Sequence, residues 1–190
     1  KIVTDIDEST TDAKLQGNLL VMTDVATSFV EAIYCPTRSE MEVYACLRMF
    51  LEAADGTDLV PRRLHSDGGA EIKAAVARLG YGRVHTTSTV ADHQGNGLIE
   101  STIRVISDAT KAALYQAGME LVWWRFAAPH MATSISVLRR NEADKSPFEL
   151  RFGSTPPKVV PFGCAGQEAS SRVSMTDTSL MRSLRHALLS

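Results

Sequence analysis

Two short stretches decide the fold of this chain, LHSDGG at residues 64–69 and GNGLIES at residues 95–101. The first is an apolar run that ends in Asp67 and two glycines, which is typical of a strand with a carboxylate at its tip. The second is a glycine-rich loop that opens an apolar-periodic segment, and it predicts a helix with Glu100 on its first turn. Two carboxylates delivered in this way suit a divalent metal ion, because hard cations prefer oxygen ligands.

A third carboxylate is available near the start of the chain, in IVTDID at residues 2–7. Three carboxylates would complete a site for phosphoryl chemistry, in which two metal ions stabilise the attacking and leaving oxygens. Asp5 and Asp7 share one face of the expected first strand because strand side chains alternate. The pattern of alternation therefore leaves both residues as candidates.

The rest of the sequence alternates between strand and helix patterns. Strands are expected at residues 1–8, 18–26, 29–35, 62–66 and 83–89. Helices are expected at residues 39–55, 71–79, 98–116 and 123–140, with a loop at 91–97 and irregular chain from residue 146. The first helix begins with a capping box formed by Ser39 and Glu42. This order predicts an α/β architecture with a mixed sheet covered by helices.

Composition places the chain among ordinary globular proteins. Its 190 residues are 44% hydrophobic and 22% charged, which suits one domain with a proper core. The three cysteines have no CxxC spacing, so neither a disulfide framework nor a zinc site is indicated. There is no signal peptide and no apolar run of membrane length, and the initial Lys suggests a fragment of a longer protein. With a net charge of −2, any contact with nucleic acid requires a local basic patch.

The order of Asp, then Asp-Gly-Gly, then Asn-Gly-x-x-Glu resembles the catalytic core of retroviral and copia-type retrotransposon integrases. VMTDVATSF at residues 21–29 resembles the second and third strands of that core. Trp124, Asn141 and SPFELRFG at residues 146–153 resemble the copia-type segment that follows it, and PFGC at 161–164 resembles its end. The resemblance covers residues 1–164 and depends on the order of the motifs.

The resemblance implies a ribonuclease H-like fold, with a mixed five-stranded sheet flanked by helices. Residues 1–118 would form the integrase catalytic core, and residues 119–164 a helical extension of the copia type. Residues 165–190 form a tail without a recognisable motif.

The family's D-D-E triad maps onto Asp5, Asp67 and Glu100, which would be both the catalytic residues and the ligands of two Mg²⁺ ions, with Mn²⁺ as a substitute. The family's first carboxylate directly follows a β-branched or small residue, which favours Asp5 and keeps Asp7 as the alternative. Asp24, on the second strand, is not a metal ligand in this family.

Four further residues are candidates for binding DNA. Arg104 matches a basic residue one turn after the family's Glu, and Lys111 lies one more helical repeat away on the same side as Glu100. Gln94 and Asn96 lie in the expected loop before the helix. Each has an ordinary alternative: Asn96 as a helix cap, and Lys111 as part of a solvated helix face.

The implied function is DNA integration, in which 3′ ends of retroelement DNA are joined to target DNA, with trimming of those ends where the element requires it. The expected partners are both DNAs and further copies of this chain, with neither a membrane nor a small-molecule cofactor. The location would be the nucleus in a eukaryotic host, and otherwise intracellular.

Two other interpretations stay open. One is a ribonuclease H-like nuclease or transposase, although no obvious further carboxylate follows Glu100 as ribonuclease H enzymes require. The other is a decayed or repurposed copy that binds nucleic acid or protein without catalysis. Gly68 stands where the family usually has Asn, and the spacing from Asp67 to Glu100 is slightly shorter than usual.

Overall fold

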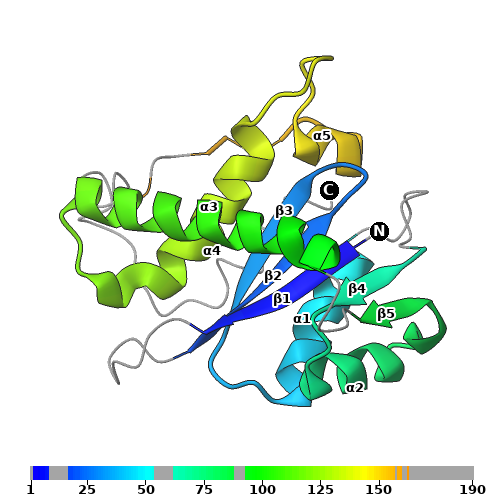
Figure 1. Cartoon of the computed structure of the whole chain (residues 1–190). Coiled ribbons are helices and arrows are strands. Elements are labelled where there is room, and N and C mark those ends of the chain that lie inside the picture. Colours follow the sequence, from blue (N-terminus) through cyan, green and yellow to red (C-terminus); the bar gives the residue numbers. More distant parts are fainter. Residues whose placement is uncertain are drawn as a thin grey trace.

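A computed structural model describes residues 2–8, 17–53, 62–87, 93–156, 158–159 and 162, with only the backbone described for residues 2–8 and 93–96. Five strands form one sheet in the order β3-β2-β1-β4-β5 (Figure 1). They are β1 (Ile2–Glu8), β2 (Asn18–Asp24), β3 (Phe29–Cys35), β4 (Leu64–Ser66) and β5 (His85–Thr87). The β1–β2 and β2–β3 pairs are antiparallel, whereas β1–β4 and β4–β5 are parallel. The mixed α/β architecture predicted from the sequence is confirmed.

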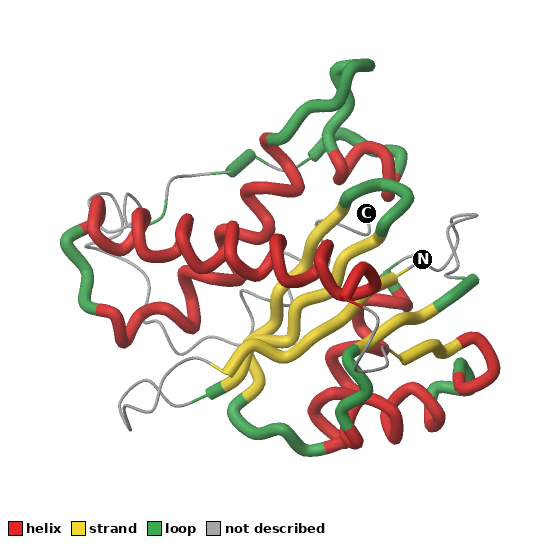
Figure 2. The backbone as a smooth tube through the Cα atoms, in the orientation of Figure 1, coloured by secondary structure: helices red, strands yellow, loops and turns green. Residues whose placement is uncertain are grey.

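Helices cover both faces of this sheet. The α-helices are α1 (Glu40–Glu52), α2 (Ala70–Arg78), α3 (His93–Ala117), α4 (Trp124–Leu138) and α5 (Pro147–Phe152), and the 3₁₀ turns are η2 (Gly82–Val84) and η3 (Leu121–Trp123). Figure 2 shows α3 crossing the sheet on the side opposite to α1 and α2. Within the described ranges, none of the helices combines the length and the hydrophobicity that a membrane span needs.

Alternation along β2 divides the core between the two faces. Leu20 and Met22 pack with α1 and α2 in one buried cluster, together with Phe29, Val43, Leu47, Phe50, Ile72 and Val76. Leu19 and Val21 pack in a second cluster with Val30, Ile99, Ile106, Ala128 and Ala132, which come from β3, α3 and α4. The helical spacing of Ile99, Ile103, Ile106, Thr110 and Ala113 predicts a buried stripe on α3; Ile99, Ile106 and Thr110 are buried, whereas Ile103 and Ala113 are half-buried. Burial of this stripe fixes which side of α3 is left for solvent.

The start of α3 differs from the prediction. Residues 93–97 were expected in a loop, but the helix already begins at His93, so Asn96 is an interior helix residue and not a cap. Gly95 and Gly97 caused the error. A glycine inside a helix costs about 1 kcal/mol relative to alanine, which burial of Ile99, Ile106 and Thr110 along one side of this long helix can offset.

The chain after residue 146 is also more regular than predicted. Ser146 caps α5: its hydroxyl accepts from the Glu149 backbone N–H at 3.1 Å, and the Glu149 carboxylate accepts from the Ser146 N–H at 2.7 Å. Pro147 fits the first helical position, and Gly153 ends the helix with φ 66°. This complete capping box was legible in the sequence. At α1 only half of the predicted capping box forms. The Ser39 hydroxyl accepts from the Glu42 N–H, but the Glu42 carboxylate accepts from the Thr37 N–H and not from that of Ser39.

Strands β4 and β5 are shorter than predicted. β5 begins at His85 because residues 82–84 form a 3₁₀ turn. The division into core, extension and tail stays a prediction, and residues 163–190 lie outside the described part of the chain.

Candidate active site

The parallel register of β1 and β4 brings two of the expected metal ligands to neighbouring positions. Ile2, Val3 and Thr4 pair with Leu64, His65 and Ser66, in that order. The next residue on each segment is Asp5 and Asp67, and neighbouring strands lie about 4.8 Å apart. The backbone therefore places residues 5 and 67 side by side, directly beyond the last paired residues of β4.

A tight turn holds Asp67 at the end of β4. Its side chain is exposed and accepts a hydrogen bond from the Gly69 N–H at 3.1 Å. Gly68 has φ +94°, which glycine adopts easily, and a Cβ there would lie 3.4 Å from the Lys73 ammonium. The chain then enters α2 at Ala70, so the turn presents the carboxylate to solvent with Lys73 close to the turn.

Glu100 lies on α3, a helix that contacts both β1 and β2. The preceding residue, Ile99, is buried in one cluster with Val21. Val21 is the antiparallel partner of Asp5. Glu100 itself is exposed, and within the described part of the chain it has no ion pair with Arg104. Because α3 begins at His93, Glu100 is its eighth residue, and the prediction that it lies on the first turn is wrong. Packing of the neighbouring Ile99 therefore positions this carboxylate, and neither the helix dipole nor a salt bridge to the next turn does so.

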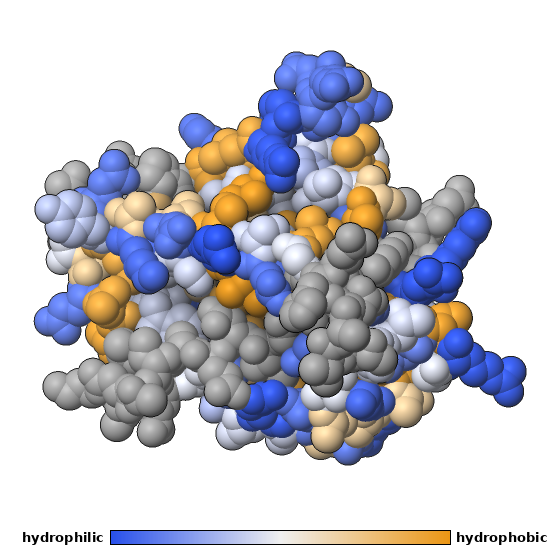
Figure 3. All heavy atoms as spheres, viewed as in Figure 1, coloured by the Kyte–Doolittle hydropathy of each residue, from blue (hydrophilic) through white to orange (hydrophobic). Residues whose placement is uncertain are grey.

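The candidate DNA-binding residues extend along α3. Arg104 and Lys111 are exposed, and the Lys111 ammonium lies 4.0 Å from the Asp108 carboxylate. Because both side chains are exposed, the Lys111–Asp108 ion pair contributes little to the stability of the fold. The backbone of Gln94 and Asn96 lies in the first turns of α3, while their side chains are outside the description. On the face seen in Figure 3, hydrophilic surface lies among apolar patches along α3.

The described side chains alone do not assemble a metal centre. Among them, no three His, Cys, Asp or Glu residues lie close enough together to hold an ion. The side chains of Asp5 and Asp7 are outside that set. The donor chemistry nevertheless fits a divalent cation, since carboxylate oxygens are the ligands that Mg²⁺ and Mn²⁺ prefer.

Asp24 has a structural role, in agreement with its rejection as a ligand. It is buried, and it accepts hydrogen bonds from the Thr27 hydroxyl at 2.9 Å and the Ala26 N–H at 3.1 Å. Arg151 of α5 forms a buried ion pair with it at 3.3 Å. The same guanidinium lies 4.1 Å from the Phe50 ring centroid and donates to the Phe50 carbonyl at 2.9 Å.

This ion pair was missed in the sequence, although Arg151 lies inside the copia-like segment. Burial lowers the pKa of the Arg151 guanidinium, and the Asp24 carboxylate opposes that shift. Even so, arginine stays protonated at neutral pH. The pair therefore joins α5 to the β2–β3 turn and to α1 as a charged contact inside the protein.

Two histidines beside Asp67 connect β4 to β5. The His65 Nδ1 lies 2.9 Å from the Thr86 hydroxyl, and the His85 Nε2 lies 2.9 Å from the Ser66 hydroxyl. Burial, and then the positive charges of His65 and Lys73, lower the pKa of His85. Each histidine thus joins neighbouring strands through a side-chain hydrogen bond.

We expect His85 to make stability depend on pH in the acidic range. The unfolded chain binds a proton near pH 6.5, whereas the folded chain resists protonation. The stabilisation is thus complete above that value and is lost as the pH falls through the lowered pKa of His85. In His85→Gln, urea unfolding midpoints measured from about pH 7.5 to 5.5 should decline less than in the wild type. An identical decline would contradict the assignment.

Comparison with known proteins gives matches only among solved structures; no protein-family profile and no curated protein matches significantly. The catalytic core domain of BIV integrase is 21% identical, with a TM-score of 0.57 over 80% of this chain and 93% of that one. The HTLV-2 integrase catalytic core domain, in complex with magnesium in a trimeric form, is 15% identical, with a TM-score of 0.59 over 79% and 94%.

A chain of the simian T-cell lymphotropic virus intasome, in complex with PP2A regulatory subunit B56 gamma, is 17% identical. Its TM-score is 0.63, over 84% of this chain and 56% of that one. At these identities the likeness concerns the fold. The chain has the ribonuclease H-like fold of retroviral integrase catalytic core domains.

Proposed function

We propose that this chain is an integrase catalytic core, which joins 3′ ends of retroelement DNA to target DNA by metal-dependent polynucleotidyl transfer. A fold alone supports many functions, so the proposal rests on the site. The observation that supports it is the β1–β4 register, because its continuation by one residue beyond Thr4–Ser66 would bring position 5 beside position 67. Ile99, which precedes Glu100 on α3, belongs to the same buried cluster as Val21, and Val21 pairs with Asp5 between β2 and β1.

The register also favours Asp5 over Asp7 as the first ligand. Asp7 lies two residues further along β1, about 6.6 Å away, and β4 ends before reaching it. Residues that pair across a ladder share a face of the sheet. Position 5 pairs with Val21, so it belongs to the face that α3 covers.

Asp5, Asp67 and Glu100 would hold two Mg²⁺ ions, or Mn²⁺ in their place. When bound, such a pair of ions stabilises the attacking and leaving oxygens of an in-line displacement at phosphorus. The magnesium in the HTLV-2 core supports this choice of ion.

The protein's own groups supply position and charge. The turn at Gly68 fixes where Asp67 stands, and the buried Ile99 fixes the side of α3 from which Glu100 projects. Arg104 and Lys111 are exposed on α3, where they would attract DNA phosphates. We propose Gln94 and Asn96, in the first turns of that helix, as further DNA contacts.

The proposal includes several copies of the chain acting together on retroelement and target DNA. The trimeric form of the HTLV-2 core and the intasome match support an assembly of this kind. Residues 1–118 would be the core and residues 119–164 its extension. In a eukaryotic host the place of action would be the nucleus.

The test is a strand-joining assay with Mg²⁺ or Mn²⁺, a labelled DNA end and a target plasmid. Removing a group that only hydrogen-bonds to a metal ligand lowers activity about 10–100-fold. Asp67 and Glu100 would contact the metal themselves, so Asp67→Asn and Glu100→Gln should each lower the joining rate by at least about 100-fold. Asp108→Asn is the matched control, because it removes an exposed acid from the same helix. Equal joining rates in the wild type and in both site variants would contradict the catalytic proposal.

A decayed copy that binds nucleic acid without catalysis is the second candidate. Gly68 in place of the family's usual Asn favours it. However, Gly68 sits at φ +94°, and both residues tolerate positive φ. Binding of the DNA end without metal-dependent joining by the wild type would identify this case.

A further inference from the structure

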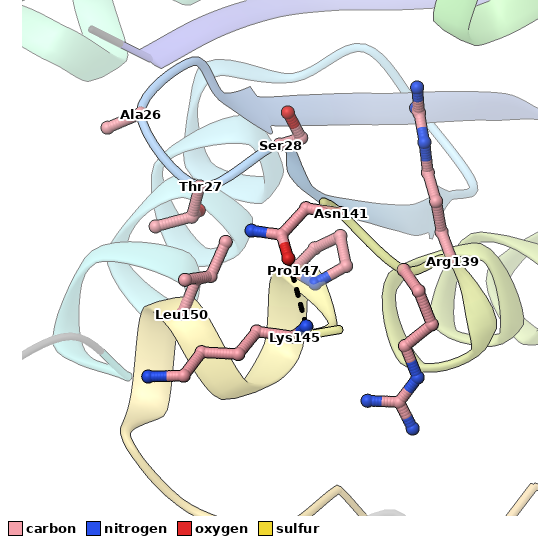
Figure 4. Close-up of a pocket in the computed structure, with 9 residues that line it drawn as sticks. Ala26, Thr27, Ser28, Arg139, Asn141, Lys145, Pro147 and Leu150 are labelled. Carbon is pink, nitrogen blue, oxygen red and sulfur yellow. Dashed lines mark hydrogen bonds between the residues drawn. The ribbon is translucent and has the colours of Figure 1, made fainter. Parts of the chain in front are cut away.

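A pocket of about 250 Å³ lies at the end of the sheet, between the β2–β3 turn and the segment that joins α4 to α5 (Figure 4). Its polar lining consists of Thr27, Ser28, Arg139, Arg140, Asn141 and Lys145. The turn and the joining segment lie more than a hundred residues apart in the sequence. Their meeting is therefore a product of the fold and not of local chain geometry.

Buried contacts hold both walls in place. The Ser136 hydroxyl accepts from the Val30 N–H at 2.8 Å and donates to the Val30 carbonyl at 2.7 Å, which ties the end of α4 to β3. The Arg151–Asp24 ion pair ties α5 to the residue before the turn. A pocket with fixed walls loses little entropy when a ligand binds.

The loop positions one donor with particular care. The Asn141 side-chain oxygen accepts from the Ala143 and Lys145 N–H groups at 3.0 and 2.9 Å. This bonding turns the amide nitrogen toward the turn side of the pocket (Figure 4). Among the described residues, that nitrogen has no hydrogen-bond acceptor.

The lining carries positive charge and no acid. Arg140 is paired with Glu149. Within the ranges that the structure describes, Arg139 and Lys145 have no ion pair. Glu142 and Asp144 belong to the same loop but do not line the pocket. In a chain of net charge −2, the pocket therefore carries a local excess of cations.

The Asn141 amide is a neutral donor of this lining, whereas the Thr27 hydroxyl already donates to Asp24. The side chains of Arg139, Arg140 and Lys145 add positive charge at the rim, and such a set suits an anion with several oxygens. We propose that this pocket binds a backbone phosphate of nucleic acid, as a second contact outside the acidic site. This inference rests on the proposed function, which supplies the nucleic acid. Asp24, next to the turn, pairs with Ile2. Position 5 is thus three residues along β1 from the partner of Asp24, about 10 Å, and the pocket lies beyond Asp24 at the turn. One bound duplex is longer than this separation.

The first test measures binding of a fluorescein-labelled DNA duplex by anisotropy, in EDTA so that catalysis plays no part. The logarithm of the affinity falls by about 0.9 for each phosphate contact when the salt concentration rises tenfold, and this fall is the salt slope. Because the pocket would hold one phosphate, the double variant Arg139→Ala/Lys145→Ala should lower the salt slope by about 1. Arg48→Ala/Arg83→Ala removes the same charge from exposed sites outside the pocket, and it should leave the slope close to that of the wild type.

The second variant, Asn141→Asp, separates the pocket from general electrostatics. It keeps an oxygen for the Ala143 and Lys145 N–H groups, so the loop is preserved, but it replaces the inward donor by a carboxylate oxygen. Losing one charge-assisted hydrogen bond should weaken duplex binding about tenfold.

Two outcomes would overturn the proposal. One is equal weakening by the pocket and control double variants. The other is unchanged duplex binding in the pocket variants while inorganic phosphate still shifts the Asn141 side-chain amide signal in NMR spectra of the wild type. That second result would assign the pocket to a small phosphate. Because the binding test is carried out in EDTA, its result does not depend on metal-dependent joining. A failed joining assay would therefore not decide whether the pocket binds DNA.

Discussion

Replacing Arg151 by methionine should lower the free energy of unfolding by about 3–5 kcal/mol. The Arg151 side chain is 1% exposed and the Asp24 side chain 8% exposed. Removing the guanidinium leaves a buried carboxylate without its counter-charge, which is far more costly than losing a surface pair. The loss also takes away the hydrogen bond to the Phe50 carbonyl and the stacking on its ring. Urea denaturation followed by circular dichroism measures the change.

A double-mutant cycle shows how much of this cost belongs to the ion pair. Asp24→Asn keeps an oxygen for the Ala26 N–H but carries no charge. In the Arg151→Met background it should therefore restore stability, whereas in the wild type it should destabilise. We expect a coupling of about 0.5–3 kcal/mol. Additive effects of the two substitutions would show that packing, and not charge pairing, dominates this contact.

Asp5→Asn should abolish strand joining, with a loss of at least about 100-fold, while Asp7→Asn should retain activity close to the wild-type rate. The difference follows from the register: position 5 continues the Thr4–Ser66 pair toward Asp67, and position 7 lies beyond it. Both residues occupy the same strand and alternate to the same face. Each substitution is therefore a matched control for the other.

Metal binding gives an independent measurement of the same assignment. Calorimetric titration with Mg²⁺ should show weaker binding in Asp5→Asn and unchanged binding in Asp7→Asn. Thermal melts of both variants establish that each is folded. The reverse pattern of rates, with only Asp7→Asn inactive, would transfer the role to Asp7.

Elements with strong periodic patterns could be predicted from the sequence. The β2–β3 hairpin follows from two apolar runs around Thr27 and Ser28, and the buried side of α3 follows from its isoleucine spacing. Prediction failed where local composition competed with context. Glycines at residues 95 and 97 suggested a loop, but burial of the rest of the helix outweighs their low propensity.

The candidate site could be foreseen in part. Motif order identified Asp67 and Glu100, but alternation could not choose between Asp5 and Asp7, because only the long-range register of β1 against β4 distinguishes them. The Arg151–Asp24 pair and the basic pocket depend on contacts between distant segments. Neither has a periodicity that a single sequence would reveal.

The Ser136 hydroxyl has a consequence for self-association. β3 is an outer strand of the sheet, and such strands can recruit a foreign strand through their unused amide and carbonyl groups. At Val30 one serine occupies both groups. Continuation of the sheet from one molecule into the next is therefore blocked at this point. At this residue the edge of β3 is thereby protected against adding a strand from another molecule.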